Sequence, residues 1–262
     1  MGVVMQLKPQ DSATTLYLDL LEQTLTGAIL EDVGFTPGSP PPPMPPIYDQ
    51  QLRLLGRDWP SHAHTMIGLT RLRHLRSLIM QVLAEDIPGD FIETGVWRGG
   101  ACIYMRALLA VYGVADRRVW VADSFEGLPP PNSELYPADA GSALHQIRYL
   151  AVSLEEVRKN FAKYNMLDGQ VMFLKGWFKD TLPTAPIKKL AILRLDGDLY
   201  ESTIQALQSL YHKLAPGGFV IVDDYHDLPG CRKAVEEFRA HHTITDVLED
   251  IDGRASFWRK RA

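Results

Sequence analysis

The sequence has few cysteines, no excess of basic residues and no long hydrophobic run. Its two cysteines, Cys102 and Cys231, lack metal-type spacing, which argues against disulfides and zinc and favours a reducing cytoplasm. A net charge of -5 offers no broad attraction to nucleic acid or to an anionic membrane. No run reaches the ~18 apolar residues that span a bilayer, and the N-terminus lacks the features of a signal peptide. We therefore expect a cytoplasmic protein with small-molecule partners, and neither nucleic acid nor membrane among them.

The chain has 262 residues, 46% of them hydrophobic, which is enough for one large core. Apolar residues recur at helical spacing over residues 15–30 and over residues 61–86, where basic residues occupy the opposite face. Between them, residues 36–46 read "TPGSPPPPMPP", which excludes helix and central strand and predicts a stiff connector or a cover. We expect residues 1–87 to form N-terminal helices and a proline-rich lid, and residues 88–262 the ligand-binding core of a single structural domain. An exposed apolar face on the first helix predicts a possible homodimer.

Strand-like and helical segments alternate along the rest of the chain. The strand-like segments are "DFIETG", "RVWVADSFEG", "QVMFLKG", "KLAILRLDGD" and "GGFVIVDDY". Such an order builds a mostly parallel sheet with helices on both faces. The last segment, "TDVLEDIDGRASFWRK", places Asp252 and Gly253 between two alternating runs and predicts an antiparallel hairpin. The predicted fold is therefore α/β, with a mostly parallel seven-stranded sheet, an antiparallel C-terminal hairpin and an N-terminal helical lid.

A glycine-rich turn follows the first of these strands. Open parallel sheets bind ligands beyond the carboxyl ends of their strands, and "ETGVWRGGA" supplies Gly95, Gly99 and Gly100 at that position. The spacing is not G-x-G-x-x-G, and Glu93 puts a negative charge where a pyrophosphate would bind. Asp123, at the end of the second strand, is placed to accept hydrogen bonds from a ribose. These features favour an adenosine-type ligand without phosphates, such as S-adenosylmethionine.

Two later strands each end in a pair of acids. Asp196 and Asp198 close the fourth strand, and Asp223 and Asp224 close the fifth. If these strands are neighbours, roughly 5 Å apart, the four carboxylates crowd together at one end of the sheet. Two carboxylates 4 Å apart repel by about 4 kcal/mol at an effective dielectric of about 20, so the cluster needs protons or a cation. Oxygen ligands favour magnesium (Mg2+) or calcium; the alternative is a set of solvated turn residues.

A cation held by Asp196, Asp223 and Asp224 would assist methyl transfer to an alcohol. An ordinary carboxylate is a weak base for an unaided hydroxyl, whereas a metal favours the alkoxide and fixes which oxygen faces the methyl group. Asp198 is then the candidate catalytic base, and Asp196 is the other acid that is placed to take the proton. The alternative role for Asp198 is that of N-cap of the helix beginning "LYESTIQAL".

Six motifs carry a resemblance to a known family: "HTMIG", "ETGVWRGGACI", "WVADSFEGLP", "GWFKDTLP", "LRLDGD" and "VIVDDY". In this order, across residues 60–262, they resemble the macrocin O-methyltransferase family, magnesium-dependent enzymes that methylate deoxysugar hydroxyls on antibiotics. The resemblance implies a class I methyltransferase Rossmann-like fold, an S-adenosylmethionine-binding catalytic core over residues 88–262 and a glycosylated antibiotic as acceptor. It also implies metal ligands at Asp196, Asp223 and Asp224, and a base at Asp198. The implied donor contacts are Thr65, Met66, Glu93, Thr94, Gly95, Val96, Trp97, Arg98, Asp123, Ser124, Gly176, Trp177 and Phe178.

Several alternatives stay open at this point. A magnesium-dependent catechol or phenol methyltransferase would use the same metal with a planar, already acidic acceptor. A nicotinamide-dependent reductase would share the sheet but is disfavoured by the missing dinucleotide fingerprint. A sensor of an adenosyl ligand would bind the donor without turnover. Among the residues, Arg98 would alternatively cap a helix, and Trp177 and Phe178 would be plain core.

Overall fold

A seven-stranded sheet organises the part of the chain that the computed structural model describes, residues 12–35 and 47–261. Its strands are β3 (Asp90–Thr94), β4 (Val119–Asp123), β5 (Val171–Lys175), β6 (Leu190–Leu195), β7 (Leu214–Val222), β8 (Glu249–Asp250) and β9 (Ser256–Arg259). They lie in the order β5-β4-β3-β6-β7-β9-β8, and only the pairings that involve β9 are antiparallel. The predicted mostly parallel sheet with a C-terminal hairpin is confirmed.

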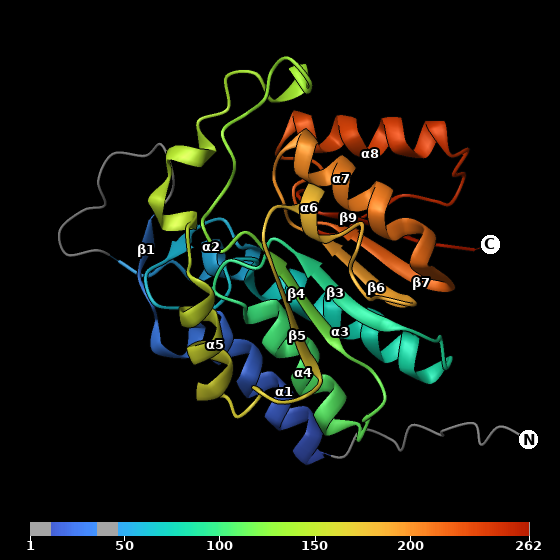
Figure 1. Cartoon of the computed structure of the whole chain (residues 1–262). Coiled ribbons are helices and arrows are strands. Elements are labelled where there is room, and N and C mark those ends of the chain that lie inside the picture. The colour runs from blue at the N-terminus through green and yellow to red at the C-terminus, as the bar shows by residue number, and fades with distance from the viewer. Residues whose placement is uncertain (1–11, 36–46, 262) are drawn as a thin grey trace, which may run out of the picture.

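Helices cover both faces of this sheet (Figure 1). One face packs against α1 (Ser12–Leu25), α3 (Gly68–Ala84), α4 (Gly100–Val111) and α5 (Leu154–Lys163). The other face packs against α6 (Phe178–Thr181), α7 (Tyr200–Leu210) and α8 (Pro229–His241). Because both faces are covered, the central strands are largely apolar, and all six residues of β6 are buried.

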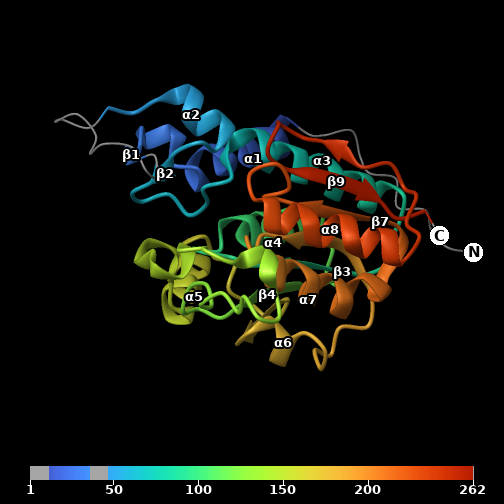
Figure 2. The ribbon, with the colours of Figure 1, turned by 90° about the horizontal axis from the view of Figure 1, so that it is seen from above.

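The N-terminal part of the chain adds smaller elements beside α1. They are η1 (Ala28–Leu30), β1 (Gly34–Phe35), α2 (Gln50–Leu55) and β2 (Trp59–Pro60), and β1 pairs with β2. Figure 2 shows α2, β1 and β2 grouped at one end of the molecule. The proline-rich run over residues 36–46 lies outside the described residues, so its predicted role as a connector or cover stays a prediction.

Both predicted N-terminal helices are shorter in the structure than in the sequence analysis. The first ends at Leu25 rather than Leu30, because Gly27 adopts a left-handed φ of 69° that breaks the helix. The second begins at Gly68 rather than Ser61. The residues before Gly68 do not join the helix. Their backbone bonds to another segment, since the N–H groups of His62 and Ala63 donate to the Asp32 carboxylate at 2.8 and 2.7 Å.

The segment between β4 and α5 is the longest connection within the core. It contains the short helical turns η2 (Pro137–Asp139), η3 (Leu144–Gln146) and η4 (Arg148–Leu150), and a further turn, η5 (Tyr211–Lys213), follows α7. Ser153 ends this segment as the N-cap of α5, where its side chain accepts a hydrogen bond from the Glu156 N–H. None of the described helices has the length and apolar character that crossing a membrane requires. Leu16 and Leu20 on α1 are 69% and 52% exposed, and the homodimer stays a prediction.

Candidate active site

A cavity of ≈ 780 Å³ lies beyond the carboxyl ends of the parallel strands. The turns that follow five of these strands supply its floor. From the predicted set, the lining residues are Met66, Gly95, Trp97, Asp123, Ser124, Trp177, Phe178, Asp196, Asp198, Asp223 and Asp224. Those that do not line it are Thr65, Glu93, Thr94, Val96, Arg98 and Gly176. The structure thus gathers all four predicted acids and about half of the predicted donor contacts around one space.

The glycine turn after β3 is pressed against the end of β6. Gly95 has a φ of 87°, and a Cβ at this position would lie 1.8 Å from the carbonyl oxygen of Asp196. Only glycine fits there. Asp123 holds the same turn from the neighbouring strand, because the N–H groups of Val96 and Phe125 donate to its two oxygens at 2.8 and 2.7 Å. A carboxylate keeps further acceptor positions after two such bonds, so Asp123 can still receive a ribose hydroxyl.

Trp177 and Phe178 are half-buried lining residues rather than plain core, because they face the cavity from the start of α6. Arg98 does not cap a helix. Its guanidinium donates to the Ala63 carbonyl at 2.8 Å and stacks over the Trp97 ring at 4.2 Å. It thereby ties the glycine turn to the segment that precedes α3.

Glu93 occupies a different place from the one predicted. Its carboxylate is buried behind the glycine turn, 2.8 Å from Arg194 Nη1, and it accepts a hydrogen bond from the Cys102 thiol at 3.0 Å. Burial raises the pKa of Glu93 to about 8, although Arg194 opposes the shift. The Glu93 carboxylate thus faces an arginine of the chain itself and does not line the cavity.

The paired acids meet because β6 and β7 are neighbours in register. Leu195 pairs with Val222, which brings the residues after each strand together. Asp196, Asp223 and Asp224 each offer an oxygen, and these three oxygens lie within 4.8 Å of one another. Asp198 lines the same cavity. The predicted convergence of carboxylates at one end of the sheet is present.

Two buried arginines, neither predicted from the sequence, neutralise part of this cluster. Arg194 Nη1 lies 2.6 Å from Asp196, and its Nη2 pairs with Asp223. Arg71 pairs with the other oxygen of Asp223. The sequence signal for Arg194 was available, because a charge inside a strand that is apolar on both faces must be paired. Arg71 belongs to the basic face of α3 that was predicted to be exposed, yet it is only 6% exposed.

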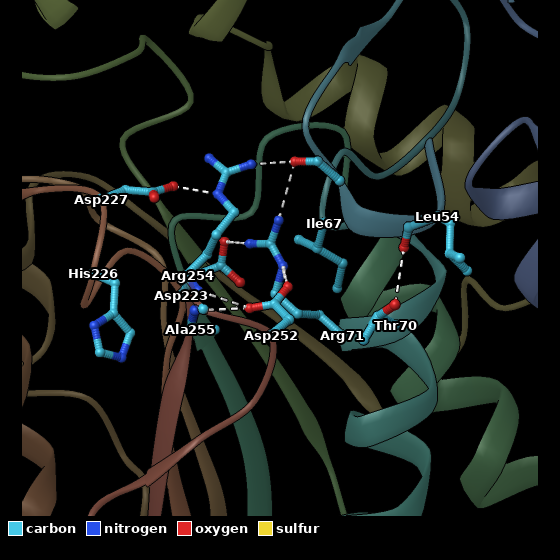
Figure 3. Close-up of polar contacts among 12 residues, drawn as sticks. Leu54, Ile67, Thr70, Arg71, Asp223, His226, Asp227, Asp252, Arg254 and Ala255 are labelled. Carbon is cyan, nitrogen blue, oxygen red and sulfur yellow. Dashed lines mark hydrogen bonds and ion pairs between the residues drawn. The ribbon is translucent and has the colours of Figure 1, made fainter. Parts of the chain in front are cut away.

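Arg71 also joins three separate segments (Figure 3). Its Nη2 donates to the Gly56 carbonyl at 3.2 Å, and its Nε lies 3.2 Å from Asp252 in the hairpin turn. The Gly56 carbonyl accepts a second hydrogen bond, from Arg254. The end of α2, the start of α3, the hairpin turn and the end of β7 are thus fastened together beside the acids.

Asp198 and Asp224 have no such arginine partner among the described residues. Burial, together with the neighbouring carboxylates, raises the pKa of Asp198 to about 8 and that of Asp224 well above its usual value. Burial and Asp223 also raise the pKa of Asp196, to about 6, although its partner Arg194 opposes the shift. Although burial also opposes the charge on Asp223, Arg194 and Arg71 hold its pKa below its usual value. Asp224 Oδ2 is buried and has no hydrogen-bond partner among the described residues. An all-oxygen donor set with an unpartnered buried oxygen fits a hard divalent cation.

Asp198 is not the N-cap of α7. The N-cap position belongs to Leu199, whose side chain makes no capping bond. The first free N–H groups of α7, those of Tyr200 and Glu201, donate instead to the Asp139 carboxylate at 2.7 and 2.9 Å. The alternative role for Asp198 is therefore wrong, and its side chain is available to the cavity.

Comparisons with known proteins agree with this geometry. The family model described as Macrocin-O-methyltransferase (TylF) matches residues 14–260. Demethyldecarbamoylnovobiocin O-methyltransferase of Streptomyces niveus is 50% identical over 98% of each chain. A tetracenomycin 4'-O-methyltransferase of Streptomyces olivaceus, which acts on a 2,3-dimethoxyrhamnosyl group by its name, is 51% identical over 96% of this chain and 95% of its own. The solved structure of the O-methyltransferase NovP covers 95% of this chain and 99% of its own at 51% identity, with a TM-score of 0.88.

These matches confirm the predicted family and the class I methyltransferase fold, and they exclude the nicotinamide reductase. They also imply S-adenosylmethionine as the methyl donor, since the relatives are named as O-methyltransferases. The glycine turn, the acids at neighbouring strand ends and the match over nearly the whole chain lead to one conclusion: this chain is an O-methyltransferase and belongs to the macrocin O-methyltransferase family.

Proposed function

We propose that this chain transfers a methyl group from S-adenosylmethionine to the 4-hydroxyl of a deoxysugar on an antibiotic glycoside, and that it requires magnesium. The noviose unit of a novobiocin-type compound is the first acceptor to test. The observation that carries the proposal is the convergence of Asp196, Asp223 and Asp224 within 4.8 Å, beside the glycine turn and in the same cavity as Asp198.

The donor would lie along the turns that follow β3, β4 and β5. Gly95 lines the cavity and has no side chain, so a ligand can approach its backbone. Asp123 would accept hydrogen bonds from the ribose hydroxyls. Met66, Trp97 and Phe178 line this part of the cavity and would provide its apolar walls. The other six predicted donor contacts do not line the cavity and would act by supporting the residues that do. They are Thr65, Glu93, Thr94, Val96, Arg98 and Gly176.

The metal would be held by Asp196, Asp223 and Asp224. When bound, magnesium would stabilise negative charge on a sugar oxygen and fix the orientation of neighbouring hydroxyls. Ion pairs fix two of these ligands in place before a metal binds. Arg194 and Arg71 each pair with Asp223, and Arg194 also pairs with Asp196. Preformed ligands lose little freedom on binding an ion.

Asp198 would take the proton that leaves the sugar hydroxyl. Asp198 lines the cavity and does not cap α7. Residues 1–87 would form the lid that excludes water from the reaction, and the described part of this segment already contributes Gly56, Trp59 and Met66 to the cavity wall.

The names of two relatives bear on the identity of the acceptor. Two relatives of nearly equal identity carry names with different aglycones, one a novobiocin and one a tetracenomycin. The name of the second specifies the 4'-oxygen of a rhamnosyl group, which supports the 4-hydroxyl as the position in this chain.

Mass spectrometry tests this proposal. The protein would be incubated with S-adenosylmethionine and magnesium, separately with demethyldecarbamoylnovobiocin, a rhamnosyl tetracenomycin lacking its 4'-methyl group, and catechol. We expect one added methyl group on a sugar, located at its 4-oxygen by fragmentation. Methylation of catechol with none of the glycosides would replace the proposal by the phenol methyltransferase, and donor binding without any product would replace it by the sensor.

A further inference from the structure

Asp139 caps a helix that is remote from it in the sequence. It lies in η2, within the long connection between β4 and α5, and its side chain is only 3% exposed. Its two oxygens accept hydrogen bonds from the N–H groups of Tyr200 and Glu201 at 2.7 and 2.9 Å, 61 and 62 positions further along the chain. The N-cap residue Leu199 offers no side-chain acceptor, so these helix N–H groups depend on Asp139.

The capped residues begin two positions after Asp198, at Tyr200. Asp198 has a φ of 62°, in the left-handed region that residues other than glycine adopt infrequently. The bonds from Asp139 fix the backbone two residues later, at Tyr200. Among the described neighbours of this turn, Asp139 is therefore a direct determinant of where the Asp198 side chain lies.

The connection that carries Asp139 also forms a wall of the cavity. On either side of Asp139 it contributes the lining residues Gly127, Leu128, Pro129, Pro130, Asn132, Leu144 and Leu150. Figure 1 shows this yellow-green segment reaching over to the ends of α7 and α8, and Figure 2 shows the same approach from above. The fit at its tip is close: a Cβ on Gly230, at the start of α8, would lie 2.9 Å from Asp139 Oδ1. The rings of Tyr136 and Tyr200 lie 5.9 Å apart.

We propose that Asp139 is a positioning residue that couples the seating of residues 124–150 over the acceptor to the orientation of Asp198. The proposal deepens the proposed function and rests on it, because Asp198 acts there as the base. When the segment is seated, both Asp139 oxygens hold the start of α7 and the left-handed turn at Asp198. When it lifts, the helix loses its cap and the base loses its position, so proton removal is confined to the covered state.

Asp139→Ala tests this coupling by kinetics. We expect kcat with a glycoside to fall by about ten- to 100-fold, the range that a small misplacement of a reacting group produces. The affinities for S-adenosylmethionine and for magnesium, measured by calorimetry, should stay within about twofold, since Asp139 touches neither predicted site. Asp139→Asn should be intermediate, because an amide oxygen can accept one N–H while the amide NH2 opposes the other.

Ser153→Ala is the matched control. Ser153 caps α5 at the other end of the same connection, where its Oγ accepts from the Glu156 N–H at 3.2 Å. This variant loses a helix cap of the same kind but leaves the start of α7 intact, so its kcat should equal that of the wild type. Equal values of kcat in Asp139→Ala and Ser153→Ala would overturn the proposal.

Hydrogen exchange separates this inference from the proposed function. In Asp139→Ala, peptides from the start of α7 and from residues 124–150 should lose protection together, while the β3 and β6 peptides keep it and show that the variant is folded. Unchanged exchange in the first two segments would overturn the coupling. If the wild type methylates no glycoside, the proposed function is wrong. The coupling is then still tested by whether the two segments lose protection together in Asp139→Ala.

Discussion

Replacement of Asp224 by asparagine should have opposite effects on stability without and with magnesium. Asp224 is 9% exposed and carries a buried oxygen that has no hydrogen-bond partner among the described residues. Its neighbours are negatively charged, so its charged form is unfavourable in the absence of a cation. The same carboxylate is a proposed metal ligand, so its charge is favourable when a cation is present. Asp224→Asn removes both effects without changing the size of the side chain.

The magnitude follows from the spacing of the acids. Two unit charges separated by 4.8 Å repel by about 3.5 kcal/mol at an effective dielectric of about 20. Protonation limits this cost, because burial raises the pKa of Asp224 well above its usual value. We therefore expect Asp224→Asn to raise the free energy of unfolding in chelator by about 1 to 3 kcal/mol, and Tm by roughly 2 to 4 °C for each kcal/mol. The size of this difference depends on pH: it is present above the unfolded-state pKa near 4 and disappears below it, where both states are protonated.

Differential scanning calorimetry with a magnesium titration is the assay. At a magnesium concentration of 100 times Kd, binding should stabilise the wild type by about 2.7 kcal/mol, and the variant should gain much less. The Tm of the variant should therefore be higher than that of the wild type in chelator, and this difference should disappear as magnesium is added. Asp116→Asn, which removes an exposed acid elsewhere, is the control and should follow the wild type in both conditions. Equal magnesium-induced shifts in the wild type and Asp224→Asn would refute the reasoning.

Three further predictions concern other residues of the site. Asp198→Asn should lower kcat by at least about 100-fold while calorimetry still detects normal donor and magnesium binding; an unchanged rate would remove Asp198 as the base. Gly95→Ala should abolish donor binding or folding, because its Cβ would lie 1.8 Å from the Asp196 carbonyl oxygen, and a soluble variant with normal donor affinity would contradict this. Burial, with help from Lys163 and Arg98, lowers the pKa of His64 to about 4, so unfolded chains take up a proton below pH 6.5 that the fold excludes. Urea unfolding should thus show a loss of about 1 to 2 kcal/mol between pH 6.5 and 4 that His64→Asn lacks; equal losses would argue against it.

The order of elements was readable from the chain because it depends on local patterns. Short strand-like segments alternating with period-3.6 hydrophobicity predicted the strands and helices, and Asp252 with Gly253 predicted the terminal hairpin. The helix limits were less predictable. Gly27 ended α1 early, and Asp32 captured the N–H groups of residues 62 and 63, which lie far from it in the sequence. A pattern of apolar residues carries no information on such a distant acceptor.

The acids of the site were found in the sequence because strand ends of a parallel sheet meet at one edge. Their electrostatic balance was not found there. Arg71 and Arg194 neutralise Asp223, and Glu93 turns away from the cavity toward Arg194. The charge on each acid depends on which basic groups lie within a few ångströms, and that distance is set by packing between elements rather than by spacing along the chain.

The sequence alone determined the fold class, the glycine turn at the first strand and the presence of four acids after two strands, because each of these is written in a few consecutive residues. Only the tertiary structure decided which acids are paired, which remain available for a cation, and that Asp139 rather than Asp198 caps α7. These outcomes arise from contacts between residues that are tens of positions apart, and the pairing of β6 with β7 and the path of residues 124–153 bring those residues together.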